Sequence, residues 1–168
     1  LVGAGKLGSR YLQGLLGLKI SCEIYIIDYS QEALDRCKKQ NKSFFNDKHD
    51  LYFSLSLPNS IKFFEIVVVA TTAKSRPILI KDLLDRYYIK YWIIEKVLAQ
   101  SIKELSQLSN YLEGNKVWIN TPRRIMPFYK QIKTKIRKSN EASLKMTVNG
   151  GGWGLACNAI HFIDLFSW

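Results

Sequence analysis

The stretch Leu1–Gly8, LVGAGKLG, places the pattern G-x-G-x-x-G between an apolar stub and a helical pattern. Gly3 can make a tight turn, Gly5 has no Cβ and lets a ligand approach the backbone, and Gly8 allows a helix to pack closely. Free N–H groups at the start of that helix attract a phosphate group. The stretch therefore predicts the dinucleotide-binding turn of a doubly wound α/β fold.

Asp28 is the second feature that favours this interpretation. The β-branched run Cys22–Ile27 predicts a strand that ends at Asp28, about 20 residues after Gly8, where an acidic residue binds the hydroxyls of a ribose. A carboxylate there repels a 2′-phosphate, so we expect NAD as the cofactor in preference to NADP. The alternative is that the glycines form an ordinary turn and Asp28 merely ends a strand.

Strands and helices alternate along the chain, which predicts a parallel sheet covered by helices on both faces. Ser30 and Ser101 are the expected N-caps of two helices. We expect a nucleotide-binding domain over residues 1–121 and the beginning of a second domain over 122–168. The expected helices are 7–16, 31–39, one opening at 77, 101–113, 122–137 and 155–168, and the expected strands are 22–27, 51–53, 66–70, 91–94, 116–120 and 143–148.

The composition is that of an ordinary globular protein, with 168 residues of which 47% are hydrophobic and 23% charged. No apolar run reaches the ~18 residues that span a membrane, and we expect neither a membrane anchor nor a signal peptide. Cys22, Cys37 and Cys157 lack metal-binding spacing, which favours a reducing compartment, the cytoplasm, and argues against a metal site. The apolar ends of the chain suggest a fragment of a longer protein.

The net charge of +11 raises nucleic-acid binding as an alternative function. The basic residues are dispersed, however, and the densest run, 130–138, is typical of the solvated face of a helix. An anionic small-molecule substrate would use the same charge. We therefore expect no nucleic-acid partner.

In an open α/β sheet, ligands bind beyond the carboxyl ends of the strands, and two further pairs of residues fall there. Thr71 and Thr72 follow one expected strand and could bind a cofactor's phosphates or ribose, or simply form a turn. Glu95 and Lys96 follow the next. A half-buried ammonium there suits acid–base work on a substrate hydroxyl, although a surface lysine is the simpler alternative.

His161 and Asp164 share one face of the last expected helix, together with Cys157. A carboxylate beside a histidine orients the ring and stabilises its charged form. The spacing alone is equally typical of a half-buried histidine on an apolar helix. Arg124 could bind an anionic substrate or face solvent.

Taken together, these segments resemble the Gfo/Idh/MocA family of NAD(P)-dependent oxidoreductases. The matching pieces cover most of the chain in the family's order, and the stretch 153–166 looks like a subgroup found with bacterial surface-polysaccharide genes. They are the turn from Gly3 to Arg10, Asp28, Ala70-Thr71-Thr72, Glu95-Lys96, the stretch 120–127 with Arg124, and His161-Phe162-Ile163-Asp164.

The resemblance implies a Rossmann domain followed by an α/β domain with a mainly antiparallel sheet, through which the protein forms a homo-oligomer. It implies hydride transfer between NAD and a hydroxyl or carbonyl of a sugar or nucleotide sugar. Lys96 and His161 would be the acid–base groups, with Asp164 orienting the histidine or binding substrate. The implied cofactor contacts are Gly3, Gly5, Lys6, Leu7, Gly8, Asp28, Thr71, Thr72 and Glu95, and the implied substrate contacts are Lys96, Arg124, Asn158 and His161.

Two positions depart from the family's pattern. Val97 stands where the family has a proline, often after a cis bond, and because a non-proline cis bond is costly we expect this turn to be built differently. Cys157 stands where many members have an aspartate. These departures keep open a second hypothesis, a non-catalytic dinucleotide-binding sensor or partner protein.

Overall fold

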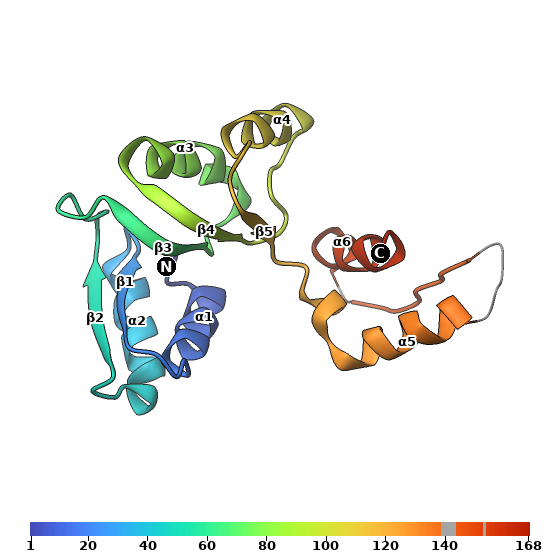
Figure 1. Ribbon diagram of the computed structural model, residues 1–168, viewed down its shortest axis with the longest axis horizontal. Coiled ribbons are helices and arrows are strands. Elements are labelled where there is room, and N and C mark those ends of the chain that lie inside the picture. Colours follow the sequence, from blue (N-terminus) through green and yellow to red (C-terminus); the bar gives the residue numbers. More distant parts are fainter. Residues whose placement is uncertain (139–143, 153) are drawn as a thin grey trace. The chain divides into compact units, whose positions relative to one another are not determined.

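The computed structural model describes residues 1–138, 144–152 and 154–168 (Figure 1). The chain divides into two compact units, Leu1–Ile119 and Asn120–Trp168, each of which is described by itself.

The first unit is built on parallel strands. Val2 forms bridges to both Ile27 and Val69, so it lies between β1 and β3 and gives the order β2-β1-Val2-β3-β4-β5. With Val2 counted as the first strand, this is the 3-2-1-4-5-6 order of a Rossmann fold, as the sequence predicted. The strands are β1 (Cys22–Ile27), β2 (His49–Ser54), β3 (Phe63–Val69), β4 (Tyr88–Ile94) and β5 (Val117–Ile119).

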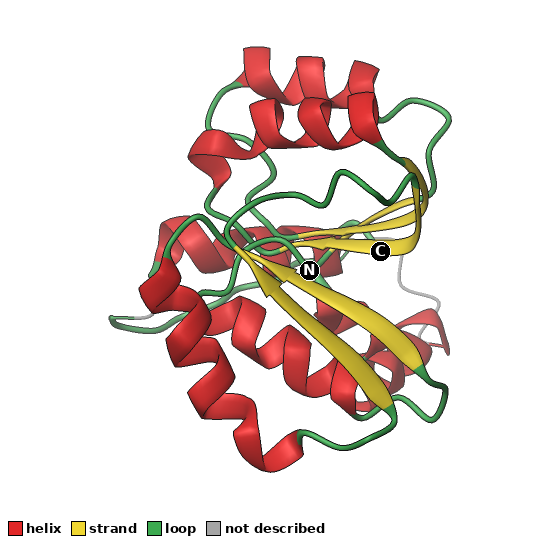
Figure 2. Cartoon of the chain, turned by 90° about the vertical axis from the view of Figure 1, so that its left-hand side faces the viewer, coloured by secondary structure: helices red, strands yellow, loops and turns green. Residues whose placement is uncertain are grey.

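Helices cover both faces of this sheet (Figures 1 and 2). Ser30 caps α2 through a bond from the Ala33 N–H, and Ser101 caps α4 through one from the Glu104 N–H, as expected. Each helix pair buries its own apolar cluster against the strands. One pair is α1 (Lys6–Leu16) and α2 (Gln31–Asn41), the other α3 (Arg76–Arg86) and α4 (Ile102–Tyr111), with short 3₁₀ turns η1 (Lys42–Phe44) and η2 (Ala73–Ser75).

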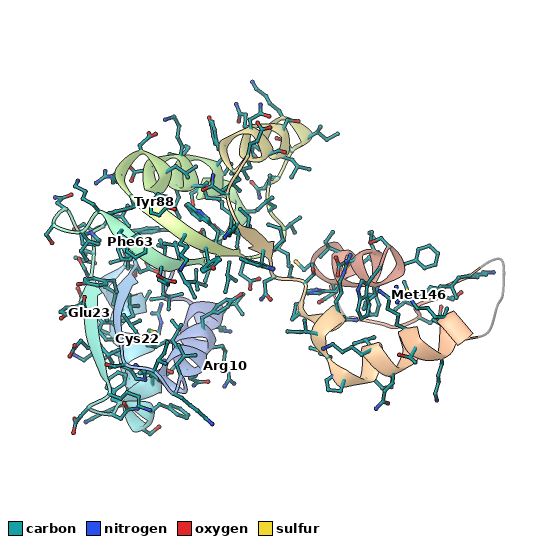
Figure 3. All side chains as sticks on the ribbon, in the orientation of Figure 1. Arg10, Cys22, Glu23, Phe63, Tyr88 and Met146 are labelled. Atoms are coloured by element: carbon teal, nitrogen blue, oxygen red, sulfur yellow. The ribbon has the colours of Figure 1, made fainter. Side chains whose placement is uncertain are left out.

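The strands β2, β3 and β4 begin two to three residues earlier than the sequence predicted, at His49, Phe63 and Tyr88. Phe63 and Tyr88 lie beside each other at the start of β3 and β4, with stacked rings whose centroids are 5.8 Å apart (Figure 3). Both side chains are exposed, so no apolar periodicity marks these positions. Cross-strand aromatic pairing extends the strands beyond their buried cores.

The second unit differs from its prediction in two places. The expected helix 122–137 is instead a 3₁₀ turn η3 (Pro122–Ile125) followed by α5 (Pro127–Lys138). Pro127 disfavours helical backbone at the residue before it, and Met126 is extended with ψ 133°. The last helix, α6 (Leu155–Phe166), begins as expected and ends two residues earlier than predicted.

The strand expected over 143–148 is also wrong for the described residues 144–148. Residue 143 lies outside the described residues, and 144–148 are irregular. A strand requires a neighbouring strand to bond, and no described strand pairs with this segment. Within the described ranges, no helix combines the length and apolarity that crossing a membrane requires.

Candidate functional site

The glycine turn is shaped by close backbone contacts at two of its three glycines. Gly3 has φ +98°, and a Cβ there would lie 2.9 Å from the carbonyl carbon of Ala70. A Cβ on Gly8 would collide with the carbonyl group of Gly3. A Cβ on Gly5, in contrast, would meet no described atom within 4 Å. The turn therefore packs against the loop after β3 on one side and is open at Gly5.

The open side of the turn is the N-terminus of α1. Its N-cap is Gly5, and the described residues provide neither a side-chain cap nor an acidic group in the first turn. Lys6 and Leu7, which form that turn, are exposed. Free N–H groups and the positive end of the helix dipole together suit a phosphate.

Asp28 joins the end of β1 to this turn. One carboxylate oxygen accepts a hydrogen bond from the Ala4 N–H at 2.8 Å, and the other accepts one from the Ser30 N–H at 2.9 Å. Each oxygen keeps a second lone pair, so Asp28 can accept from ribose hydroxyls as well. The spacing from Gly8 predicted the position of Asp28 but not its bond to the turn.

Thr71 and Thr72 follow β3 at the same edge of the sheet. The Thr71 hydroxyl is buried and has no hydrogen-bond partner among the described residues. Thr72 is exposed and precedes η2. A buried hydroxyl without a partner is costly, which fits a residue that bonds a cofactor.

Glu95 and Lys96 follow β4. Glu95 is buried, and its carboxylate accepts a hydrogen bond of 2.6 Å from the Tyr11 hydroxyl on α1. Burial first, and this bond second, raise the pKa of Tyr11, so the phenol stays neutral. Lys96 is half-buried. The Lys96–Val97 peptide bond is cis, so the expectation of a differently built turn is wrong.

Arg76, which the sequence did not single out, contacts the loop after β3 and the turn after β4. Its side chain is buried, and the guanidinium donates to the carbonyl oxygens of Thr71, Glu95, Val97 and Leu98. Carbonyl groups on both sides of the cis bond thus share one donor. Because arginine is almost always exposed, the sequence gives no reason to expect a buried one here. The only local signal is Pro77, the next residue, which marks the start of a helix.

In the second unit, Arg124 on η3 is paired with Asp164 on α6. One terminal nitrogen of Arg124 lies 2.7 Å from one Asp164 carboxylate oxygen, and its Nε lies 2.7 Å from the other. The same guanidinium donates to the Asp164 carbonyl at 2.9 Å. The structure thus joins Asp164 to Arg124, a contact that the sequence did not predict.

The remaining candidates also lie on α6. His161 and Asn158 are half-buried, and Cys157 is exposed. The Asn158 amide donates to the Gly154 carbonyl at 3.3 Å. Lys96 belongs to the first unit and His161 to the second. Among the described residues, no group of three or more His, Cys, Asp or Glu side chains could hold a metal ion.

No protein-family model and no curated protein matches the sequence. The structure is similar to myo-inositol 2-dehydrogenase from Lactobacillus plantarum, with a TM-score of 0.72 and 14% identity over 99% of this chain and 54% of that one. It is similar to the WlbA dehydrogenase from Bordetella pertussis, solved with NADH and UDP-GlcNAcA, with a TM-score of 0.70 and 16% identity over 99% and 53%.

A third similar structure is the transcriptional regulator Gal80p from Kluyveromyces lactis, with a TM-score of 0.62 and 16% identity over 86% of this chain and 42% of that one. The chain spans about half the length of the two dehydrogenases. At these identities the likeness concerns the fold alone. The first unit of this chain is a Rossmann-type α/β domain.

Proposed function

We propose that this protein is an NAD-dependent oxidoreductase that acts on a hydroxyl or carbonyl group of a sugar or nucleotide sugar. The observation that carries the proposal is the glycine turn, which is open above Gly5 at the point where the strand order reverses. Dinucleotides bind at such a switch point in open α/β sheets. The dehydrogenases with similar folds support the same class of cofactor.

The residues of the first unit fit such a cofactor. The N–H groups at Lys6, Leu7 and Gly8 would hold the diphosphate and Asp28 the ribose. The Thr71 hydroxyl, which no described residue bonds, would bind a second polar group of the ligand. When bound, a nicotinamide cofactor accepts or supplies a hydride. The carboxylate of Asp28 favours NAD over NADP because a 2′-phosphate would bring like charges together.

Lys96 and His161 are the proposed acid–base groups. The Lys96 ammonium would donate a proton to the reacting substrate oxygen, or take one from it, with His161 as its partner. Asp164 would act through Arg124, which it binds, and Asn158 and Arg124 would contact the substrate. A nucleotide sugar used in surface-polysaccharide synthesis is the proposed substrate, supported by the ligand of the similar Bordetella structure.

Calorimetric titration of the purified protein with NAD, NADH, NADP and NADPH tests the cofactor. We expect NADH to bind and the phosphorylated forms to bind more weakly. Asp28→Ser should remove that preference, whereas Asp47→Ser, which changes an exposed aspartate after η1, should not. Absence of heat with all four nucleotides would contradict the proposal.

Lys96→Met tests the chemistry. We expect NADH affinity to stay near that of the unaltered protein and turnover to fall about 100-fold, as is usual for the loss of a general acid–base group. Lys103→Met, an exposed lysine on α4, is the matched control and should keep full turnover. Tight NADH binding without turnover on a wide panel of sugars and nucleotide sugars would instead favour the non-catalytic sensor.

A further inference from the structure

Arg76 occupies an unusual environment for a cation. It is 1% exposed, and its donors point at backbone carbonyl groups: Nη1 donates to Glu95 at 2.5 Å and to Val97 and Leu98, while Nη2 donates to Thr71. Burial lowers the pKa of Arg76, and the nearby Glu95 carboxylate opposes that shift. The charge therefore stays on the guanidinium while all four bonds go to the main chain.

These four carbonyl groups belong to two loops that follow neighbouring strands. Thr71 lies in the loop after β3, and Glu95, Val97 and Leu98 lie in the turn after β4, on either side of Lys96. Beyond the last paired residues of β3 and β4, Val69 and Ile94, one further backbone bond runs from the Glu95 N–H to the Val69 carbonyl. Arg76 thus continues the connection of the two strands into their loops, where the ladder ends.

A third segment reaches the same turn through Glu95. The Tyr11 hydroxyl on α1 donates to the buried Glu95 carboxylate, and α1 begins at the glycine turn. The turn that carries Lys96 is therefore bound by Arg76 on α3 and, through Glu95, by Tyr11 on α1. Only the Lys96 side chain, among the residues from Glu95 to Leu98, carries an ammonium that could act on a substrate.

We propose that Arg76 is a positioning residue: by binding the main chain on both sides of Lys96 and the carbonyl of Thr71, it fixes the Lys96 ammonium relative to the loop after β3 that carries Thr71 and Thr72. The proposal rests on the proposed function, in which Lys96 performs acid–base chemistry. Arg76 touches neither substrate nor cofactor in this role. A misplacement of about 1 Å in a reacting group can cost about 100-fold in rate.

The planar fork of the guanidinium is what this role requires. Its two terminal nitrogens donate in fixed directions to two loops at once, whereas a lysine ammonium is a single point on a flexible stem. Arg76→Lys keeps the positive charge but cannot bond all four carbonyl groups. Arg76→Lys therefore tests whether the protein requires the guanidinium's fork or only its positive charge. It is a milder change than Arg76→Gln, which also removes the charge.

The experiment compares Arg76→Lys and Arg76→Gln with Arg86→Lys and Arg86→Gln in the purified protein. Arg86 lies at the other end of α3, where it is exposed and pairs with Asp82 at 2.7 Å. Three quantities are measured for each folded variant: the affinity for NADH, the turnover on the best substrate of the panel, and the pH profile of Lys96 acetylation by acetic anhydride. Mass spectrometry of the Lys96 peptide provides the last readout without any turnover.

We expect Arg76→Lys to leave NADH affinity within about threefold and to lower turnover about 100-fold, because the ammonium is displaced while the glycine turn is intact. The acetylation profile of Lys96 should shift relative to that of Lys103, and both Arg86 variants should behave as the unaltered protein. Arg76→Gln should give the same pattern with larger effects, and its failure to fold would leave Arg76→Lys to decide.

The proposal is overturned if folded Arg76→Lys retains the turnover and the Lys96 acetylation profile of the unaltered protein. It is also overturned if Arg76→Lys does not fold, because Arg76 would then be purely structural. If the unaltered protein turns over no substrate, the proposed function fails, but the acetylation profile still tells whether Arg76 sets the environment of Lys96.

Discussion

The two units of the chain differ in the interactions that stabilise each of them. In the first unit, large side chains such as Trp92 and Leu12 are 0% exposed between sheet and helices. In the second unit, none of the described side chains is buried, and Phe128 and Ile163 are 64% and 62% exposed. The first unit is therefore ordered by burial of apolar surface, whereas the second carries an ion pair and cation–π contacts among side chains that stay partly exposed.

Two arginines show the same difference in burial between the units. Arg76 in the first unit is enclosed and bonds only main-chain carbonyl groups among the partners described for it. Arg124 in the second unit is partly exposed, with 36% of its side chain accessible, and pairs with a carboxylate. A buried donor is costly to lose because its acceptors are left without water, whereas a solvated ion pair is cheap to lose. Stability should thus respond strongly to changes in the first unit and weakly to those in the second.

The largest effect is expected at the glycine turn. Gly8→Ala places a Cβ against the carbonyl group of Gly3, with the carbonyl carbon only 2.8 Å away, so the turn or the helix must move. We expect the free energy of unfolding to fall by at least about 3 kcal/mol. Gly14→Ala on the same helix, where a Cβ meets no described atom within 4 Å, should instead stabilise by about 0.5 kcal/mol. Urea unfolding of both variants checks this, and equal stabilities would contradict it.

Arg76→Leu should cost about 3 kcal/mol, because four carbonyl groups lose a buried donor at once. Arg86→Leu, on the exposed end of the same helix, should cost less than about 1 kcal/mol. Thermal and urea unfolding measure both. If Arg76→Leu lowers the free energy of unfolding no more than Arg86→Leu does, the expected difference between a buried and a solvated arginine is contradicted.

The parts of the fold that the sequence predicted are those whose signal is local. The glycine turn, the strand ending at Asp28 and the caps at Ser30 and Ser101 all depend on residues within a few positions of one another. The parallel sheet with helices on both faces followed from the alternation of strands and helices. Even the position of the glycines required for packing, Gly3 and Gly8, follows from the spacing of the pattern.

The contacts that the sequence did not predict join residues far apart in the chain. Arg76 bonds a turn about 20 residues later, and Tyr11 reaches Glu95 across 84 positions. No sequence pattern marks either residue as buried, because the burial of a lone polar side chain depends on what packs around it. In the second unit, the expected strand over 143–148 failed for a related reason: alternation shows that a segment can form a strand but does not supply the neighbouring strand.

Asn41 provides a further test of buried polar contacts in the first unit, with a smaller expected effect. Its side chain is 0% exposed, and the amide donates to the Ser9 hydroxyl and the Cys37 carbonyl, each at 2.8 Å. Asn41→Ala should cost about 2 kcal/mol because these acceptors lose their donor. Asn59→Ala, an exposed asparagine, should change the unfolding free energy by less than about 0.5 kcal/mol. Urea unfolding compares them, and a cost at Asn41 as small as at Asn59 would be inconsistent with this packing.

The pH dependence of stability in Tyr11→Phe tests the hydrogen bond from Tyr11 to Glu95. The ordinary pKa of tyrosine is 10.0, and that of Tyr11 is raised in the folded protein. Below pH 10 the phenol is neutral in both states and the bond contributes about 1 kcal/mol. Above pH 10 the unfolded chain loses the proton that the folded one keeps, so stability falls with rising pH. The advantage of the unaltered protein over Tyr11→Phe should therefore shrink above pH 10, and stability curves that stay parallel would contradict the bond.

The smallest effect is expected for the ion pair of the second unit, where it serves as the counterpart of Arg76. A double-mutant cycle of Arg124→Gln and Asp164→Asn should give a coupling of about 0.5 kcal/mol, because both groups keep contact with solvent. Screening should reduce this coupling further in high salt, whereas the cost of Arg76→Leu should stay nearly constant. A coupling above about 2 kcal/mol that salt does not change would mean that Arg124 and Asp164 are as enclosed as Arg76. The two units would then not differ in the way that their exposed surfaces indicate.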